Sequence, residues 1–198
     1  HYFYNVEFDE IDGRNGCRRA RFFIRLGITP AWRPEMVDVR LNVPMVDQSG
    51  IKKTKSGTKA LNNACWYAAA CMVSYFHRPG PRLGIPGLWQ ADQGLPPSRI
   101  PDLCANEGLV PLFQPTTITP EWLATVLTKF GPIWAAGHFL DRPDQTEIGH
   151  VIVITGIQQR IVHYNDPEGP PPRTMLLGTL DTGRHRPDGL LVKGSHRY

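Results

Sequence analysis

Three residues, Cys65, His150 and Asp166, have the chemical types that nucleophilic catalysis by a thiol needs. The run from Cys65 to Phe76 is rich in alanine and contains no Gly or Pro, and short polar residues that suit an N-cap precede it, so it predicts a buried helix. A thiol at the N-terminus of a helix faces the positive end of the macrodipole, which favours the nucleophilic thiolate. A buried cysteine is more often an inert apolar side chain, however, so a base elsewhere in the chain must decide.

A candidate base lies in two β-branched, apolar runs, residues 147–156 and 161–167, which a short segment separates. This pattern predicts two adjacent antiparallel strands of a hairpin. His150 opens the first strand and Asp166 closes the second, so these two ends should lie side by side. The carboxylate can then accept the imidazole N–H while the other ring nitrogen faces a thiol. The order of the elements therefore predicts a Cys-His-Asp triad.

Two alternative assignments stay open on spacing alone. Asn165 can orient His150 in place of Asp166, but adjacent residues of a strand point to opposite faces, so only one of them can serve. His138, in a strand expected over residues 133–139, is a rival base, and aspartates in the loop that follows it could orient its ring. It is the weaker candidate because no carboxylate ends a matching strand.

The same residues resemble a known family. Cys65-Trp66 at a helix start, Gly149-His150 leading an apolar strand and Asn165-Asp166-Pro167 ending the next resemble the bacterial papain-like cysteine peptidases, and most closely the group of secreted effector proteases. The resemblance extends over roughly residues 41 to 180. It implies an α+β fold in which the helix carrying the nucleophile packs on an antiparallel sheet carrying the base. It also favours Asp166 over Asn165 as the orienting residue.

A further element of the resemblance is the segment 43–48, which is similar to the one that supplies the oxyanion-hole glutamine, here Gln48. In these peptidases the glutamine lies only a few residues before the cysteine, whereas here the gap is 17 residues. The polar run 49–59 reads as an inserted loop, which costs little stability on a surface. Asn62 or Asn63 would be the next amide donors to consider.

Residues that could contact a substrate are Trp66, Trp89 and Gly149. Each neighbours the predicted triad or lies in the Gly- and Pro-rich stretch 82–97, which is expected to be irregular. Trp89 could line a substrate groove or simply anchor its loop to the core.

The remaining elements are expected to support this site. Residues 1–40 predict an N-terminal β-hairpin appendage, and residues 41–198 the peptidase domain. Short helices are predicted over 98–107, with Ser98 as N-cap, and from Thr119 to Phe130. Strands are predicted over 174–180 and 190–193, joined by a polar turn at 181–186.

Composition narrows the class of protein. A net charge of +4 is too small to indicate a dedicated nucleic-acid binder, although an inactive peptidase-like module that binds DNA or RNA through basic loops stays an alternative. The four cysteines have no spacing typical of zinc sites, and Cys71 and Cys104 are expected to pack in the core. No apolar run is long enough to cross a membrane, no signal peptide is recognisable, and the missing initiator Met suggests a fragment. The proposed chemistry needs no metal or organic cofactor.

The expected activity is therefore cysteine endopeptidase cleavage of a protein substrate. The same triad can also deamidate glutamine, transfer acyl groups as a transglutaminase does or cut cell-wall amides, and the fold does not decide among these reactions. The resemblance implies a toxin that a bacterial secretion system, for example type VI, delivers into the cytosol of a target cell. A cognate immunity protein that blocks the groove is the expected second partner.

Overall fold

The structure is a computed structural model that describes residues 37–50, 63–78, 93–139 and 149–194, all within one compact unit, Met36–Tyr198. The hairpin predicted before residue 37 and the candidate Trp89 lie outside these residues. Asp38–Arg40, which the sequence assigned to the appendage, form a strand of the sheet.

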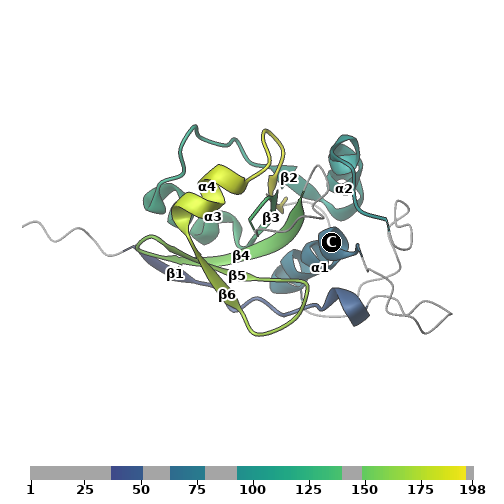
Figure 1. Cartoon of the computed structure of the whole chain (residues 1–198), viewed down its shortest axis with the longest axis horizontal. Coiled ribbons are helices and arrows are strands. Elements are labelled where there is room, and N and C mark those ends of the chain that lie inside the picture. The colour runs from purple at the N-terminus through teal and green to yellow at the C-terminus, as the bar shows by residue number, and fades with distance from the viewer. Residues whose placement is uncertain (1–36, 51–62, 79–92, 140–148, 195–198) are drawn as a thin grey trace, which may run out of the picture. The chain divides into compact units, whose positions relative to one another are not determined.

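The framework is a seven-stranded antiparallel sheet (Figure 1). Along it the strands follow the order β2, β7, β3, β4, β5, β6, and β1 pairs with the C-terminal part of β4. The central strand β4 is the longest. One of its edges is long enough to pair with both β3 and β1, and its other edge pairs with β5. The strands are β1 Asp38–Arg40, β2 Leu109–Pro111, β3 Ile133–Gly137, β4 His150–Gln158, β5 Ile161–Asn165, β6 Arg173–Leu176 and β7 Leu190–Lys193.

Both faces of the sheet are covered, which explains why β3 and β4 are apolar almost throughout. Alternate residues divide between two cores, with Trp134 and Val153 in the core that contains α1 (Cys65–His77) and Ile133 and Ile152 in the core that contains α3 (Pro120–Phe130). The α+β architecture predicted from the sequence, with a helix packed on an antiparallel sheet, is confirmed.

Helix α1 begins at Cys65, as predicted, but not for the predicted reason. Its N-cap is Ala64, which has no side-chain capping hydrogen bond; instead the backbone N–H groups of Tyr67 and Ala68 both donate to the Ala64 carbonyl. Every residue from Trp66 to Ser74 is buried. Burial on all sides therefore stabilises this helix in place of a polar cap.

Helix α3 begins as predicted, and α2 (Ile100–Glu107) ends as predicted but begins later. The Thr119 hydroxyl accepts a hydrogen bond from the Trp122 N–H at 3.2 Å and caps α3. Helix α2 ends at Gly108 in the left-handed conformation, with φ of 61°. Its N-cap is Arg99, not Ser98, because Pro97–Arg99 form a separate 3₁₀ turn, η2.

The segment after β5 differs from the prediction. The strand expected over 174–180 ends at Leu176, and Leu177–Gly183 form helix α4. Leu177 and Leu180 are both buried, and a spacing of three residues puts both on one side of a helix but on opposite faces of a strand. The predicted strand at 190–193 is confirmed as β7.

Candidate active site

Cys65 is the first residue of α1 and a free, half-buried thiol. It packs against the core cluster that α1 shares with the sheet. The indole N–H of Trp134 in β3 donates to the backbone carbonyl of Trp66 at 2.9 Å. The start of the helix is thus fixed to the sheet one residue after the thiol.

His150 and Asp166 are in direct contact, as the hairpin prediction required. Nε2 of His150 donates to Oδ1 of Asp166 at 2.8 Å, and the two residues are 7% and 0% exposed. In the β4–β5 register Val153 lies opposite Asn165, so Asp166 follows directly beyond the last pair. The strand ends therefore bring the imidazole and the carboxylate together.

The second contact joins His150 to Cys65. Burial alone lowers the pKa of His150, but hydrogen bonds with Asp166 and with Cys65, together with the charges of these two groups, raise its pKa to about 9. Because Nε2 already bonds Asp166, Nδ1 is the ring nitrogen left for the thiol. At neutral pH the imidazole of His150 therefore holds its proton.

Asp166 has more partners than the sequence indicated. Its Oδ1 also accepts the backbone N–H of Glu168 at 3.0 Å, and its Oδ2 accepts from Nη1 of Arg173 at 2.6 Å. Burial by itself would raise the pKa of this carboxyl, but the contacts with His150, Glu168 and Arg173 lower it below its ordinary value. Asp166 is thus a buried, ionised carboxylate held at both oxygens.

Arg173 was missed by the sequence reasoning. It begins β6, where it pairs with Tyr164 of β5, and the turn between these strands brings it back to Asp166. The sequence did contain a signal for this contact. If the strand expected over 174–180 had been paired with the strand that ends at Asp166, Arg173 would have been placed beside the carboxylate. The pairing of those two strands was not predicted.

Asn165, the alternative orienting residue, has a different function in the structure. Its side-chain amide donates to the carbonyl of Val43 at 3.1 Å, away from His150. This bond holds the segment that leads to Gln48 against the sheet.

Gln48 opens the 3₁₀ turn η1 (Gln48–Gly50), which packs on α1. Its backbone N–H donates to the carbonyl of Pro167 at 2.7 Å, so it is tied to the residue after Asp166. Met45 and Val46 pack against the same core cluster as Cys65. Asn63 is exposed just before α1, and Asn62 lies outside the described residues.

The predicted substrate contacts fare differently. Trp66 is only 2% exposed and belongs to the core, so its burial contradicts the expected role on a groove surface. Gly149 has φ of +76°, and a Cβ there would lie 2.3 Å from the carbonyl oxygen of Gly137. Glycine is required because the chain must pass close to β3 immediately before His150.

Four other His and Cys side chains differ from the proposed triad in their surroundings. His138 is exposed, whereas the hydrogen bonds with Cys65 and Asp166 are made by His150. Cys71 is buried inside α1. Burial, with a smaller effect from Asp188, raises the pKa of Cys104 to about 11, so this thiol stays protonated. His163 accepts from Arg40 through Nδ1 at 2.6 Å and is a structural residue on β5.

Two other features, a metal-binding cluster and a membrane-spanning helix, are absent from the described residues. Those residues contain no group of three or more His, Cys, Asp or Glu side chains that could hold a metal ion. Among the helices that these residues form, none is long and apolar enough to cross a membrane.

A comparison with protein families places this geometry in context. Residues 40–182 match the family described as papain-like cysteine protease AvrRpt2. The match covers well over half of the chain and includes all three members of the contact chain Cys65–His150–Asp166. The chain belongs to this family of papain-like cysteine proteases, and it is a hydrolase of the thiol protease class.

Proposed function

We propose that Cys65, His150 and Asp166 form the catalytic triad of an endopeptidase that cleaves a protein substrate. The observation that carries the proposal is the continuous set of hydrogen bonds from the thiol through the imidazole to a buried carboxylate. A nucleophile, a base and an orienting group in this order are what cysteine protease chemistry requires.

In the first half of the reaction, the Cys65 thiolate attacks the scissile carbonyl and forms a tetrahedral intermediate. The imidazolium of His150 then gives its proton to the leaving amine, and the C–N bond breaks to leave a thioester on Cys65. In the second half, His150 takes a proton from water as the water attacks the thioester. The thiolate leaves, and the acid product departs with the imidazolium restored.

Asp166 contributes by fixing the orientation of the ring and stabilising its charge. Its bond to Nε2 keeps Nδ1 directed at the thiol, and its other oxygen is occupied by Arg173. The carboxylate therefore does not need to take up a proton during the cycle.

The oxyanion of the intermediate would be bound by the backbone N–H of Cys65 and the side-chain amide of Gln48. Three observations support Gln48: η1 packs on α1, its N–H bonds Pro167, and the residues before it share a core cluster with Cys65. Asn63 is the alternative donor.

The experiment that tests the proposal is a comparison of substrate proteomes after incubation with wild type and with Cys65→Ala. Endopeptidase activity creates new peptide N-termini that depend on the thiol. Conversion of Gln to Glu without a new N-terminus would show deamidation and would overturn the protease assignment for the substrate concerned.

The biological role that we propose is that of a bacterial effector, secreted and active in the cytosol of a target cell. The support is membership of the family described as papain-like cysteine protease AvrRpt2, together with the resemblance of the triad segments to secreted effector proteases. If the target can be a sibling bacterium, a cognate immunity protein that covers the cleft is the expected partner. Expression in bacterial cytosol should then be toxic with Cys65 present, harmless with Cys65→Ala, and relieved by a neighbouring open reading frame.

A further inference from the structure

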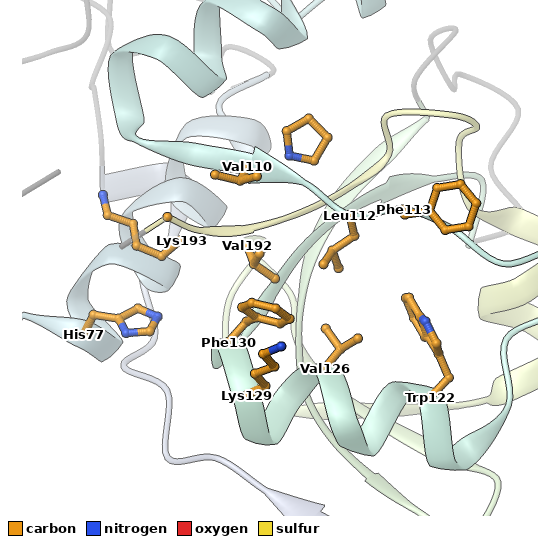
Figure 2. Close-up of a pocket in the computed structure, with 12 residues that line it drawn as sticks. His77, Val110, Leu112, Phe113, Trp122, Val126, Lys129, Phe130, Val192 and Lys193 are labelled. Atoms are coloured by element: carbon orange, nitrogen blue, oxygen red, sulfur yellow. The ribbon is translucent and has the colours of Figure 1, made fainter. Parts of the chain in front are cut away.

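A hollow lies at the end of α1 away from the thiol. It is a groove of about 860 Å³. One wall is β2 and the residues that follow it up to Phe113, and the other walls are the end of β7 and helix α3. Figure 2 shows Leu112 and Val192 directed across it toward Val126 and Phe130. His77, the last residue of α1, lines it, so an α-helix of 13 residues separates it from Cys65 by about 18 Å.

The rim of this groove is unusually apolar. Phe113 is 93% exposed and Val110 is 48% exposed, and they are two of only four large apolar side chains that are exposed among the described residues. A small ligand sunk in the groove would leave Phe113 in water. Only a partner that continues past the rim can cover it, and exposed aromatic side chains beside a pocket are typical anchors of protein interfaces.

The charge along the groove has one sign. Lys193 and His77 lie at one end, Lys129 lies beside Phe130 with its ammonium 5.1 Å from the ring centroid, and no Asp or Glu is among the lining residues. Lys193 is held in place by hydrogen bonds that include those to the carbonyl of Glu107 and the hydroxyl of Ser74. Burial and the charge of Lys193 lower the pKa of His77, so the positive charge that is exposed to a partner here is that of Lys129.

The backbone of β2 argues against a partner that simply adds a strand. The Leu112 N–H donates to the Leu190 carbonyl, and the Gly194 N–H donates to the Gly108 carbonyl. The backbone N–H and C=O groups of the even-numbered residues in this segment therefore point to β7. Pro111 therefore faces the outer edge, where it has no N–H to offer. Docking must depend mainly on side chains in the groove, as for an amphipathic helix laid between a helix and a strand.

We propose that the groove between β2 and α3 is a docking site for an amphipathic, acidic segment of another protein. Apolar side chains of the segment would fill the space between Leu112 and Phe130 and cover Phe113. Its carboxylates would lie toward the exposed ammonium of Lys129. The proposal is independent of the catalytic one, because docking can be measured in protein that lacks the thiol.

The test uses a phage library of random 16-residue peptides, selected on the full chain carrying Cys65→Ala. The same library is counter-selected on this protein with Phe113→Ser and Lys129→Glu added, two exposed changes that should leave folding intact. Enriched peptides should combine Asp or Glu with large apolar residues at helical spacing. Matching thermal unfolding curves would confirm that the variants are folded.

A synthetic peptide of the enriched sequence then gives the affinities. We expect Phe113→Ser to weaken binding about tenfold or more, which is the typical effect of losing an interface anchor. Lys129→Glu should weaken it and reduce its dependence on salt, while Leu176→Ser, which removes an exposed apolar side chain on β6, should change nothing. No enrichment, enrichment of peptides without acidic residues, or affinities that neither groove change alters would overturn the proposal.

Discussion

Arg173 forms an ion pair with Asp166 at 2.6 Å, and it does so from the side of the carboxylate that faces away from His150. Asp166 is fully buried, whereas the Arg173 side chain is 36% exposed. A carboxylate with no access to water needs a partner on each oxygen to stay ionised. Arg173 is therefore a positioning residue: it acts on the proposed chemistry through Asp166.

Replacement of Arg173 tests this relationship. Arg173→Met should lower kcat/KM about tenfold to a hundredfold, because the carboxylate loses one of the contacts that fix it against His150. The charge of Arg173 helps to lower the pKa of Asp166, so its removal should move the acidic limb of the pH–rate profile to higher pH. The kcat/KM of Arg173→Lys should fall between those of wild type and Arg173→Met, since lysine keeps the charge but loses the planar geometry of the guanidinium.

A matched control for this variant is Arg99→Met. Arg99 also pairs with an aspartate, Asp102, but both side chains are about half exposed, so the change should alter neither rate nor pH profile. If Arg173→Met lowered activity with an unchanged acidic limb, Arg173 would be only a structural residue.

Removal of the thiol is the direct test of the triad. Cys65→Ala should reduce hydrolysis by at least about a thousandfold, because the only proposed nucleophile is lost. Cys71→Ala, six residues further along the same helix and buried, should keep activity and cost only a small amount of stability. Turnover of a peptide substrate by both proteins, at matched thermal stability, gives the comparison; equal activities would refute the assignment.

The amide donor to the oxyanion can be identified by two substitutions. Gln48→Ala should lower kcat about a hundredfold to a thousandfold with little change in KM, since an oxyanion donor acts mainly in the transition state. Asn63→Ala should leave kcat unchanged. The reverse result would assign the role to Asn63.

The raised pKa of His150 gives an activity prediction at high pH. The imidazolium must be present to protonate the leaving amine, so kcat/KM should fall as the pH rises through about 9. Asp166→Asn removes a contact that raises this pKa and should move the alkaline limb to lower pH. A limb that does not move in this variant would mean that another group titrates there.

The same group links stability to pH. His150 has a folded-state pKa of about 9 and an ordinary value of 6.5, so its contribution to the free energy of unfolding is complete below pH 6.5 and is lost as pH rises through 9. The loss should be on the order of 1 to 3 kcal/mol. Urea unfolding at pH 6 and pH 9.5 measures it, and His150→Gln should show less of this dependence.

The backbone conformation of Gly149, directly before His150, gives a further prediction. Gly149→Ala should destabilise the protein by about 1 to 3 kcal/mol or displace His150, because φ is +76° and the new Cβ would meet the Gly137 carbonyl at 2.3 Å. Gly178→Ala, in α4 with open space around the new Cβ, should be neutral or slightly stabilising. Thermal unfolding of both variants provides the measurement, and equal effects would contradict the close-approach argument.

The sequence predicted the elements whose signals are local. The long apolar run of α1 and the β-branched hairpin could be recognised because period and composition reflect local burial. The order of the strands alone placed His150 beside the end of the second strand. Asp166 was chosen over Asn165 through family resemblance; in the structure Asp166 bonds His150, whereas Asn165 bonds Val43.

What could not be predicted depends on distant packing. Arg173 approaches Asp166 only because β6 pairs with β5, and a sequence does not state which strands pair. Trp66 looked like a groove residue because an aromatic next to a nucleophile can face either way, and only the surrounding core shows that it is buried. Helix α4 was missed because so short an apolar run does not distinguish a helix from a strand that is buried on both faces.

The embedding of α1 has a consequence for how this protease loses activity. The thiol begins a helix whose next nine residues are buried, and the neighbouring carbonyl is bonded to the central part of the sheet through Trp134. The nucleophile and the base consequently cannot separate unless the core itself comes apart. Gradual denaturation should therefore abolish hydrolysis by the proposed triad at the same midpoint as global unfolding.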